Sequence, residues 1–188
     1  MNNLKRIEMF SMEDLMTVSN VMGTLNWAEN KTYLDPDNKR LKSNFHVSTS
    51  DNTDNLTEMI MVQERGNHNI LKNIMGYNTF KIRDINIIRY DKNHFHNWMH
   101  NQLIGNIGEI TFMILLNDAD EGGNLEIHLD DISNSTINID DWKLGEGIFF
   151  PTIYRHRMNK VITGEKIIMV GQIQPDITST SDRKFHTQ

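Results

Sequence analysis

The stretch LGEGIFFPTIYRHRMNKVITGEKIIMVGQIQ, residues 144–174, decides the fold of this chain. Its apolar run at 148–150 is typical of a buried strand, and Pro151 predicts the end of that strand because proline has no N–H to donate to a sheet. A Thr-Gly pair then predicts a turn, and a second apolar run follows at 166–170. The stretch therefore predicts short strands arranged around the histidine that lies between the two runs.

His156 and Lys166 are the side chains of this stretch that can carry chemistry. A hairpin of the predicted kind places the histidine on one strand and the lysine on the next, close in space. A neutral imidazole is a common metal ligand. A lysine near it could hold an anion that also contacts the metal. The same pattern also fits an ordinary hairpin with a surface histidine and a surface lysine.

The segment FFPTIYRHRMNKVITGEK resembles the C-terminal motif of the iron(II)/2-oxoglutarate dioxygenases, most closely in the prolyl-hydroxylase-like branch that includes the iron-uptake-factor oxygenases. The positions that match are Phe150, Pro151, His156, Arg157, Val161, Thr163 and Gly164. Lys166 stands where the family usually has the arginine that binds the distal carboxylate of 2-oxoglutarate. Lysine keeps the positive charge but lacks the bidentate fork of arginine.

The resemblance implies iron(II) and 2-oxoglutarate as cofactors. It places His156 among the metal ligands and Lys166 at the cosubstrate, with Tyr90 and Thr163 as further residues of the cosubstrate pocket. The implied reaction is oxidative decarboxylation of 2-oxoglutarate coupled to hydroxylation of a C–H bond. The C–H bond would belong to a peptide, such as a prolyl residue, or to a small molecule.

The first metal motif of the family is H-x-D, which follows a Y-x-x-G turn. The matching stretch here is YDKNHFHNWMHNQ, residues 90–102. With one inserted residue the ligands map to His100 and Gln102, and without it they map to Met99 and Asn101. Neither alignment supplies the carboxylate. Two histidines and one carboxylate normally hold iron(II) on one face, so Gln102, a neutral oxygen donor, would be a weak third ligand.

Two other interpretations remain open from the residues. His94 and His96 alternate, so in a regular strand they share a face, and with His156 they could form a three-histidine iron site of the cupin kind. Alternatively, the missing carboxylate favours a catalytically degenerate oxygenase fold. Such a module would bind an anion, a peptide or neighbouring subunits in a homo-oligomer or an assembly such as a virus particle.

Composition narrows the function classes. The 188 residues include 25 acidic and 19 basic side chains, giving a net charge of −6, and no basic run predicts nucleic-acid binding. The chain has no cysteine, no apolar run of transmembrane length and no signal-peptide core at its start. We therefore expect a cytoplasmic protein that binds no membrane. Its richness in Asn, Ile, Lys and Asp is typical of an A+T-rich genome, such as that of a virus or of a streamlined bacterium. A viral protein of this kind would act in the host cytoplasm or in the virion.

The order of the chain predicts an α+β fold in one domain. A capping pair, Ser11 and Asp14, predicts a helix that Gly23 ends, and a second helix is expected over 54–65. From residue 79 the apolar residues alternate at roughly period two, as in half-buried strands.

We expect helices up to about residue 78, a core over about 79–174 and a tail from 175 to 188. The strands should form a two-sheet jelly roll. The family resemblance implies the same double-stranded β-helix.

Overall fold

The computed structural model describes residues 4–35, 40–48, 80–99, 109–130 and 135–175. They contain the helix α1 (Met12–Met22) and a series of strands. The strands are β1 (Lys5–Glu8), β2 (Trp27–Asp35), β3 (Arg40–Ser48), β4 (Phe80–Tyr90), β5 (Phe95–Met99), β6 (Ile110–Asn117), β7 (Glu121–Gly122), β8 (Leu125–Asp130), β9 (Ser135–Ile139), β10 (Glu146–Pro151), β11 (Arg155–Met158), β12 (Val161–Thr163) and β13 (Lys166–Pro175).

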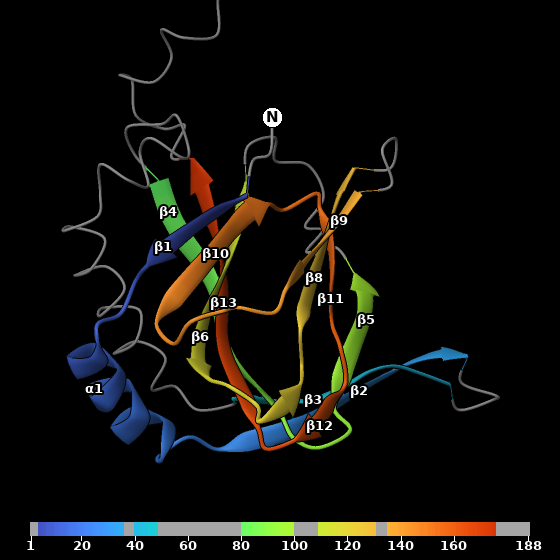
Figure 1. Ribbon diagram of the computed structural model, residues 1–188, viewed down its shortest axis with the longest axis horizontal. Coiled ribbons are helices and arrows are strands. Elements are labelled where there is room, and N and C mark those ends of the chain that lie inside the picture. The colour runs from blue at the N-terminus through green and yellow to red at the C-terminus, as the bar shows by residue number, and fades with distance from the viewer. Residues whose placement is uncertain (1–3, 36–39, 49–79, 100–108, 131–134, 176–188) are drawn as a thin grey trace, which may run out of the picture.

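The strands form one strongly curled antiparallel sheet of eleven strands in the order β1-β10-β6-β13-β4-β3-β5-β11-β8-β9, with β2 paired to β3. The sheet curls on itself, so β10, β6, β13 and β4 form one wall and β8, β11 and β5 form the facing wall (Figure 1). A two-stranded sheet, β12-β7, lies at one end. This is the predicted jelly-roll architecture, a double-stranded β-helix.

Helix α1 begins as the sequence predicts. The Ser11 hydroxyl accepts a hydrogen bond from the Asp14 N–H, and the Asp14 carboxylate accepts one from the Ser11 N–H, which satisfies two of the free donors at the helix start. Gly23 caps the other end, with its N–H donating to Ser19 O. Leu15 and Val18 are buried, so the helix packs its apolar side on the outside of the barrel wall (Figure 1).

Two apolar layers follow from strand alternation. Inside the barrel, one layer is built from side chains of both walls; it includes Tyr90, Leu115, Ile127, Phe150 and Ile168. A second layer lies between the outer face of one wall and α1; it includes Val18, Ile87, Phe112, Ile114, Phe149 and Met169. The inner layer is the one that surrounds the candidate site described below.

The structure differs from the predicted helical N-terminal part at residues 27–35 and 40–48. These two segments form β2 and β3, which pair with each other and, through β3, with β4 and β5. Strand β2 pairs only with β3 among the described strands, so it lies at the margin of the sheet. The helix expected at 54–65 lies outside the described residues. No helix in the described part of the chain is long and apolar enough to cross a membrane.

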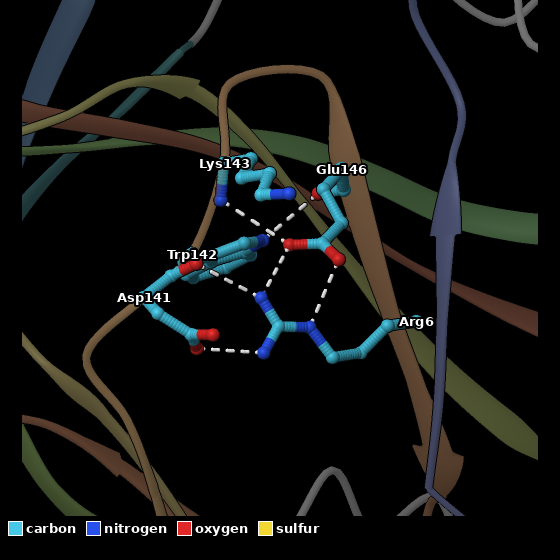
Figure 2. Close-up of polar contacts among 5 residues, drawn as sticks. All are labelled: Arg6, Asp141, Trp142, Lys143 and Glu146. Atoms are coloured by element: carbon cyan, nitrogen blue, oxygen red, sulfur yellow. Dashed lines mark hydrogen bonds and ion pairs between the residues drawn. The ribbon is translucent and has the colours of Figure 1, made fainter.

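Arg6 ties the first strand to the barrel wall. Its guanidinium donates from Nε and Nη2 to the two carboxylate oxygens of Glu146, at 2.9 and 2.7 Å, and from Nη1 to Asp141 Oδ1 at 2.6 Å (Figure 2). Hydrogen bonds to these carboxylates raise the pKa of Arg6 further above its usual range. The Trp142 indole N–H donates to Glu146 O at 2.9 Å, so the same turn also fixes the Trp142 ring (Figure 2).

Candidate metal and cosubstrate site

His156 lies on β11 with its side chain inside the barrel. Its partner in the register of β8 is Ile127, an inner-layer residue, and its exposed fraction is 1%. The Phe150 ring packs against the imidazole edge-on, with ring centroids 5.4 Å apart. Strand β10 ends at Pro151, as predicted, and the phenyl ring of the residue before it, Phe150, lies directly beside His156.

His96 meets His156 across the pair β5–β11. The two imidazoles lie edge to face, with ring centroids 5.4 Å apart, and His96 is 3% exposed. The register runs His156 opposite Met99 and Met158 opposite His96, with an irregularity between them. Because of this shift, both Met99 and His96 face the same side as His156, although they are an odd number of residues apart.

The inner ring nitrogen of His96 has the properties of a metal donor. The Tyr90 hydroxyl and His96 Nδ1 share a hydrogen bond of 2.7 Å, whereas His96 Nε2 is buried and makes no hydrogen bond within the described part of the chain. Burial lowers the pKa of His96 well below its usual value, and the nearby His156 lowers it further, so the ring is neutral. If Nδ1–H donates to the hydroxyl oxygen, the lone pair remains on Nε2.

Tyr90 stays protonated in this environment. It is fully buried, and burial raises the pKa of its hydroxyl far above the usual value. Its ring also packs against Phe45, with centroids 5.7 Å apart. Tyr90 is thus a fixed neutral group that sets the orientation of His96.

Lys166 opens β13 directly opposite Tyr90 in the register of β4. The side chain is buried, with an exposed fraction of 3%, and its ammonium lies 2.5 Å from Asp118 Oδ1 and 5.3 Å from the centroid of the Trp142 ring. The Asp118 side chain is 45% exposed. Lys166 therefore carries a buried charge that a solvent-facing carboxylate neutralises.

These side chains form a continuous series across the inner face. Lys166 opposes Tyr90 in the register, Tyr90 is hydrogen-bonded to His96, and His96 contacts His156. A cation at one end and two imidazoles at the other can bind a molecule with a carboxylate at each end, one on the cation and one on a metal.

Two of the other predicted site residues, His94 and Thr163, lie apart from this series. His94 precedes β5 and turns its ring toward His46, with centroids 4.9 Å apart. Thr163 lies at the exposed end of β12, where its carbonyl accepts a hydrogen bond from the Asp120 N–H. His100 and Gln102 lie outside the described residues.

Two residues of the site were not identified from the sequence. Asp118 lies directly after the core strand β6, and nothing in the sequence around it connects it with Lys166, 48 positions later. Trp142 sits in the turn before β10, and its contact with Lys166 depends on the closure of the barrel. Both are long-range contacts, for which a single sequence carries no signal.

The residues present fit a bound iron(II). Imidazole nitrogen is a ligand that suits iron. The barrel offers two adjacent buried imidazoles, and His96 Nε2 is a shielded donor atom with no other function in the described structure. The tyrosine bound to the second nitrogen of His96 is the kind of outer partner that orients a ligating histidine.

Comparison with known proteins finds similarity to a curated hydroxylase over part of the chain. No family model matches the chain. A PKHD-type hydroxylase of Prochlorococcus marinus (strain AS9601) is 35% identical over 82 residues, which are 41% of this chain and 34% of that relative. The chain thus matches only about a third of the length of this curated relative.

Solved structures of low sequence identity share the fold. An oxidoreductase of the 2OG-Fe(II) oxygenase family from Burkholderia pseudomallei superposes with a TM-score of 0.70 at 15% identity, covering 92% of this chain and 85% of the other. The viral collagen prolyl hydroxylase from Paramecium Bursaria Chlorella virus-1, in its 2-oxoglutarate complex, gives a TM-score of 0.57 at 17% identity, covering 92% and 96%. The chain therefore has the double-stranded β-helix fold of the iron(II)/2-oxoglutarate oxygenases, and its sequence resembles the prolyl-hydroxylase-like branch of that superfamily.

Proposed function

We propose that this protein is an iron(II)/2-oxoglutarate-dependent dioxygenase whose metal is held by His96 and His156 and whose cosubstrate is anchored by Lys166. The observation that carries the proposal is the contact of two buried imidazoles inside the barrel, one of which presents a shielded ring nitrogen with no hydrogen bond in the described structure. When bound, iron(II) and 2-oxoglutarate would supply the oxidising chemistry of this superfamily with dioxygen as the oxidant, one oxygen atom ending in the succinate left after decarboxylation and the other in the hydroxyl group formed from a C–H bond.

Each neighbouring residue has a task in this site. Tyr90 holds the Nδ1 of His96 and so directs Nε2 inward. Phe150 covers one side of the His156 ring and keeps water from it. The low pKa of His96 keeps its lone pair available for a metal at neutral pH, because the ring does not take up a competing proton.

Lys166 is the proposed partner of the distal carboxylate of 2-oxoglutarate. The Lys166 ammonium is buried, so it would attract an anion more strongly than an exposed ammonium does. The reason is that the low dielectric of the interior screens the attraction between opposite charges less than water does. In the structure, the Asp118 carboxylate forms an ion pair with this ammonium. Because the Asp118 side chain is nearly half exposed, it can swing into solvent when a carboxylate binds from inside the barrel.

His100 and Gln102 remain proposed ligands from the family motif. They follow β5 directly in the chain, so they are candidates for the third metal position beside His96 and His156. His94 is the less favoured ligand of the three-histidine alternative, because its ring packs on His46 rather than on His96. The prime substrate we propose is a peptide, such as a prolyl-containing one, in keeping with the hydroxylases that the chain resembles.

Lys166→Met should weaken the binding of 2-oxoglutarate. Methionine keeps the apolar stem and removes the charge, so the distal carboxylate would be desolvated without a cationic partner. We expect at least a roughly tenfold loss of affinity, since a hydrogen bond to a charged group contributes about 1.5–3 kcal/mol. Calorimetric titration of the metal-loaded chain with 2-oxoglutarate measures the effect.

Asp118→Asn is the matched control. Asparagine keeps the size of the side chain but no longer competes as an anion for Lys166 Nζ, so 2-oxoglutarate should bind at least as tightly as in the wild type. Unchanged affinity in Lys166→Met would assign the cosubstrate carboxylate to another residue. A loss in Asp118→Asn as large as that in Lys166→Met would indicate a general disturbance of the site.

A further inference from the structure

A second group of metal-ligand side chains lies on the outer face of the sheet, away from the barrel interior. His46 on β3 opposes Arg89 on β4 in the register. Arg89 stacks over the Trp27 ring, with its Cζ 4.7 Å from the ring centroid, and Trp27 packs in the layer on the α1 side of the wall. The preceding residue on β3, Phe45, turns inward to Tyr90. Strand alternation therefore puts His46 on the face opposite the proposed iron site.

His46, Asp91 and His94 come together at this face from β3 and from the turn after β4. One ligand atom from each lies within 4.8 Å of the other two. Asp91 Oδ2 is 3.0 Å from His46 Nδ1 and 4.0 Å from His94 Nδ1. The ligands of a tetrahedral zinc ion, at about 2.0–2.2 Å from the metal, are spaced by roughly 3.4 Å. Small side-chain rotations therefore suffice to place all three atoms on one ion.

The donor atoms are in suitable chemical states. His46 Nδ1 is shielded from solvent and makes no hydrogen bond of good geometry in the described structure, although a carboxylate oxygen lies next to it. His94 Nδ1 accepts a hydrogen bond of 3.1 Å from the Asp91 N–H, so the ring lone pair is on Nδ1, and a metal ion would take the place of this N–H as its partner.

The surroundings supply one further carboxylate and one competing cation. Glu29 on β2 is the register partner of His46, so the two side chains share a face, and the carboxylate now pairs with Lys31 Nζ at 2.5 Å. Arg89 Nε lies 3.3 Å from Asp91 Oδ1, the oxygen that is turned away from the histidines. Glu29 can thus complete a set of two nitrogens and two oxygens while Arg89 retains the outer oxygen of Asp91.

We propose that His46, Asp91 and His94 form a second metal site for a divalent transition ion of the zinc type, with Glu29 as the fourth ligand. Two imidazoles and two carboxylates are a donor set that zinc accepts in tetrahedral geometry. The ion would join β3 to the turn that follows β4 and so brace the wall that carries Tyr90. This site requires neither iron nor 2-oxoglutarate, and it gives His94 a role apart from the barrel histidines.

The test is a titration of the tag-free full chain, freed of metal by a chelator, with zinc ions alone. The measurement uses a His156→Ala background, in which the proposed iron site is removed. We expect one zinc ion to bind per chain. Changing His46 or His94 to glutamine in that background should weaken binding by more than the roughly 10–100-fold that loss of a ligand's outer partner costs. Glu29→Gln should weaken it less.

A control variant and a spectrum make the outcome specific. His128→Gln alters a buried histidine on β8 that is not part of the group, and zinc binding should not change. Cobalt(II) in the same chain should show the intense visible absorption of a four-coordinate site, and His46→Gln should remove it. Circular dichroism verifies that the variants are folded. The proposal is overturned if no zinc binds in the His156→Ala chain, or if binding survives both His46→Gln and His94→Gln.

Discussion

His156→Ala is expected to remove iron(II) binding from the barrel and, with it, all turnover of 2-oxoglutarate. His156 is almost fully buried, contacts the ring of His96 and matches the distal histidine of the family motif. Loss of a ligand should cost more than the roughly 10–100-fold in metal affinity that loss of a ligand's hydrogen-bonding partner costs. Anaerobic titration with iron(II), performed in a His46→Gln background so that the outer group does not contribute, measures it.

The same titration separates the candidate ligand sets. His96→Ala should cause a loss comparable to that of His156→Ala, whereas His94→Ala should leave barrel binding intact. His100→Ala reports whether the motif residue contributes as well. His128→Ala serves as the control, because this buried histidine lies on β8 next to inward-facing Ile127 and so points to the other face. Retention of iron(II) affinity in both His96→Ala and His156→Ala would contradict the proposed site.

Phe150→Ala should destabilise the fold by about 3–5 kcal/mol, the typical cost of removing a fully buried phenyl ring. The Phe150 side chain has no exposed surface and lies in the inner layer, packed edge-on against His156. The deletion leaves a cavity that the two facing walls of the barrel can close only in part. Urea denaturation followed by tryptophan fluorescence gives the free energy of unfolding.

A surface substitution provides the reference for that measurement. Ile153→Ala removes a side chain that is 74% exposed, and it should change stability by less than about 0.5 kcal/mol. Phe150→Leu should fall between the two, since leucine fills most of the space. A loss below about 1 kcal/mol in Phe150→Ala would contradict a close-packed inner layer beside the histidine.

The C-terminal half of the barrel was predictable because its sequence signals are local. The apolar run at 148–150 and Pro151 set the end of β10, and the apolar run that opens at Lys166 became β13. The capping pair at Ser11 likewise fixed the start of α1. In each case the deciding residues are neighbours in the chain, so their pattern is sufficient.

Strand β2 was not predicted because its sequence lacks an apolar alternation, whereas in β3 the apolar residues Leu41, Phe45 and Val47 do alternate but the polar Ser43 interrupts the pattern. Residues 29–32 of β2 read ENKT, and all four are exposed. A strand at the margin of a sheet with little buried surface is held by backbone pairing to its neighbour, which leaves no apolar pattern. Backbone pairing with β3 therefore holds β2 in the sheet, although the sequence of β2 has no apolar pattern that would predict a strand.

The histidine cluster shows why local periodicity could not define the site. Alternation predicts His94 and His96 on one face, but Asn93 adopts φ 71°, a left-handed conformation that asparagine tolerates, and His94 closes this turn before β5 begins. Because of this turn, the His94 ring packs against the His46 ring, and the His96 ring packs against the His156 ring.

The most direct test of a metal-and-cosubstrate site in the barrel is the dependence of 2-oxoglutarate binding on a metal. Calorimetry with and without manganese(II), a divalent ion that can stand in for iron(II) without reacting, compares the two affinities in the wild type, His96→Ala and His156→Ala. We expect 2-oxoglutarate to bind appreciably only when the metal is present, and only in the wild type. Equal binding without metal, or binding that persists in both histidine variants, would contradict the proposal that His96 and His156 hold the metal that 2-oxoglutarate contacts.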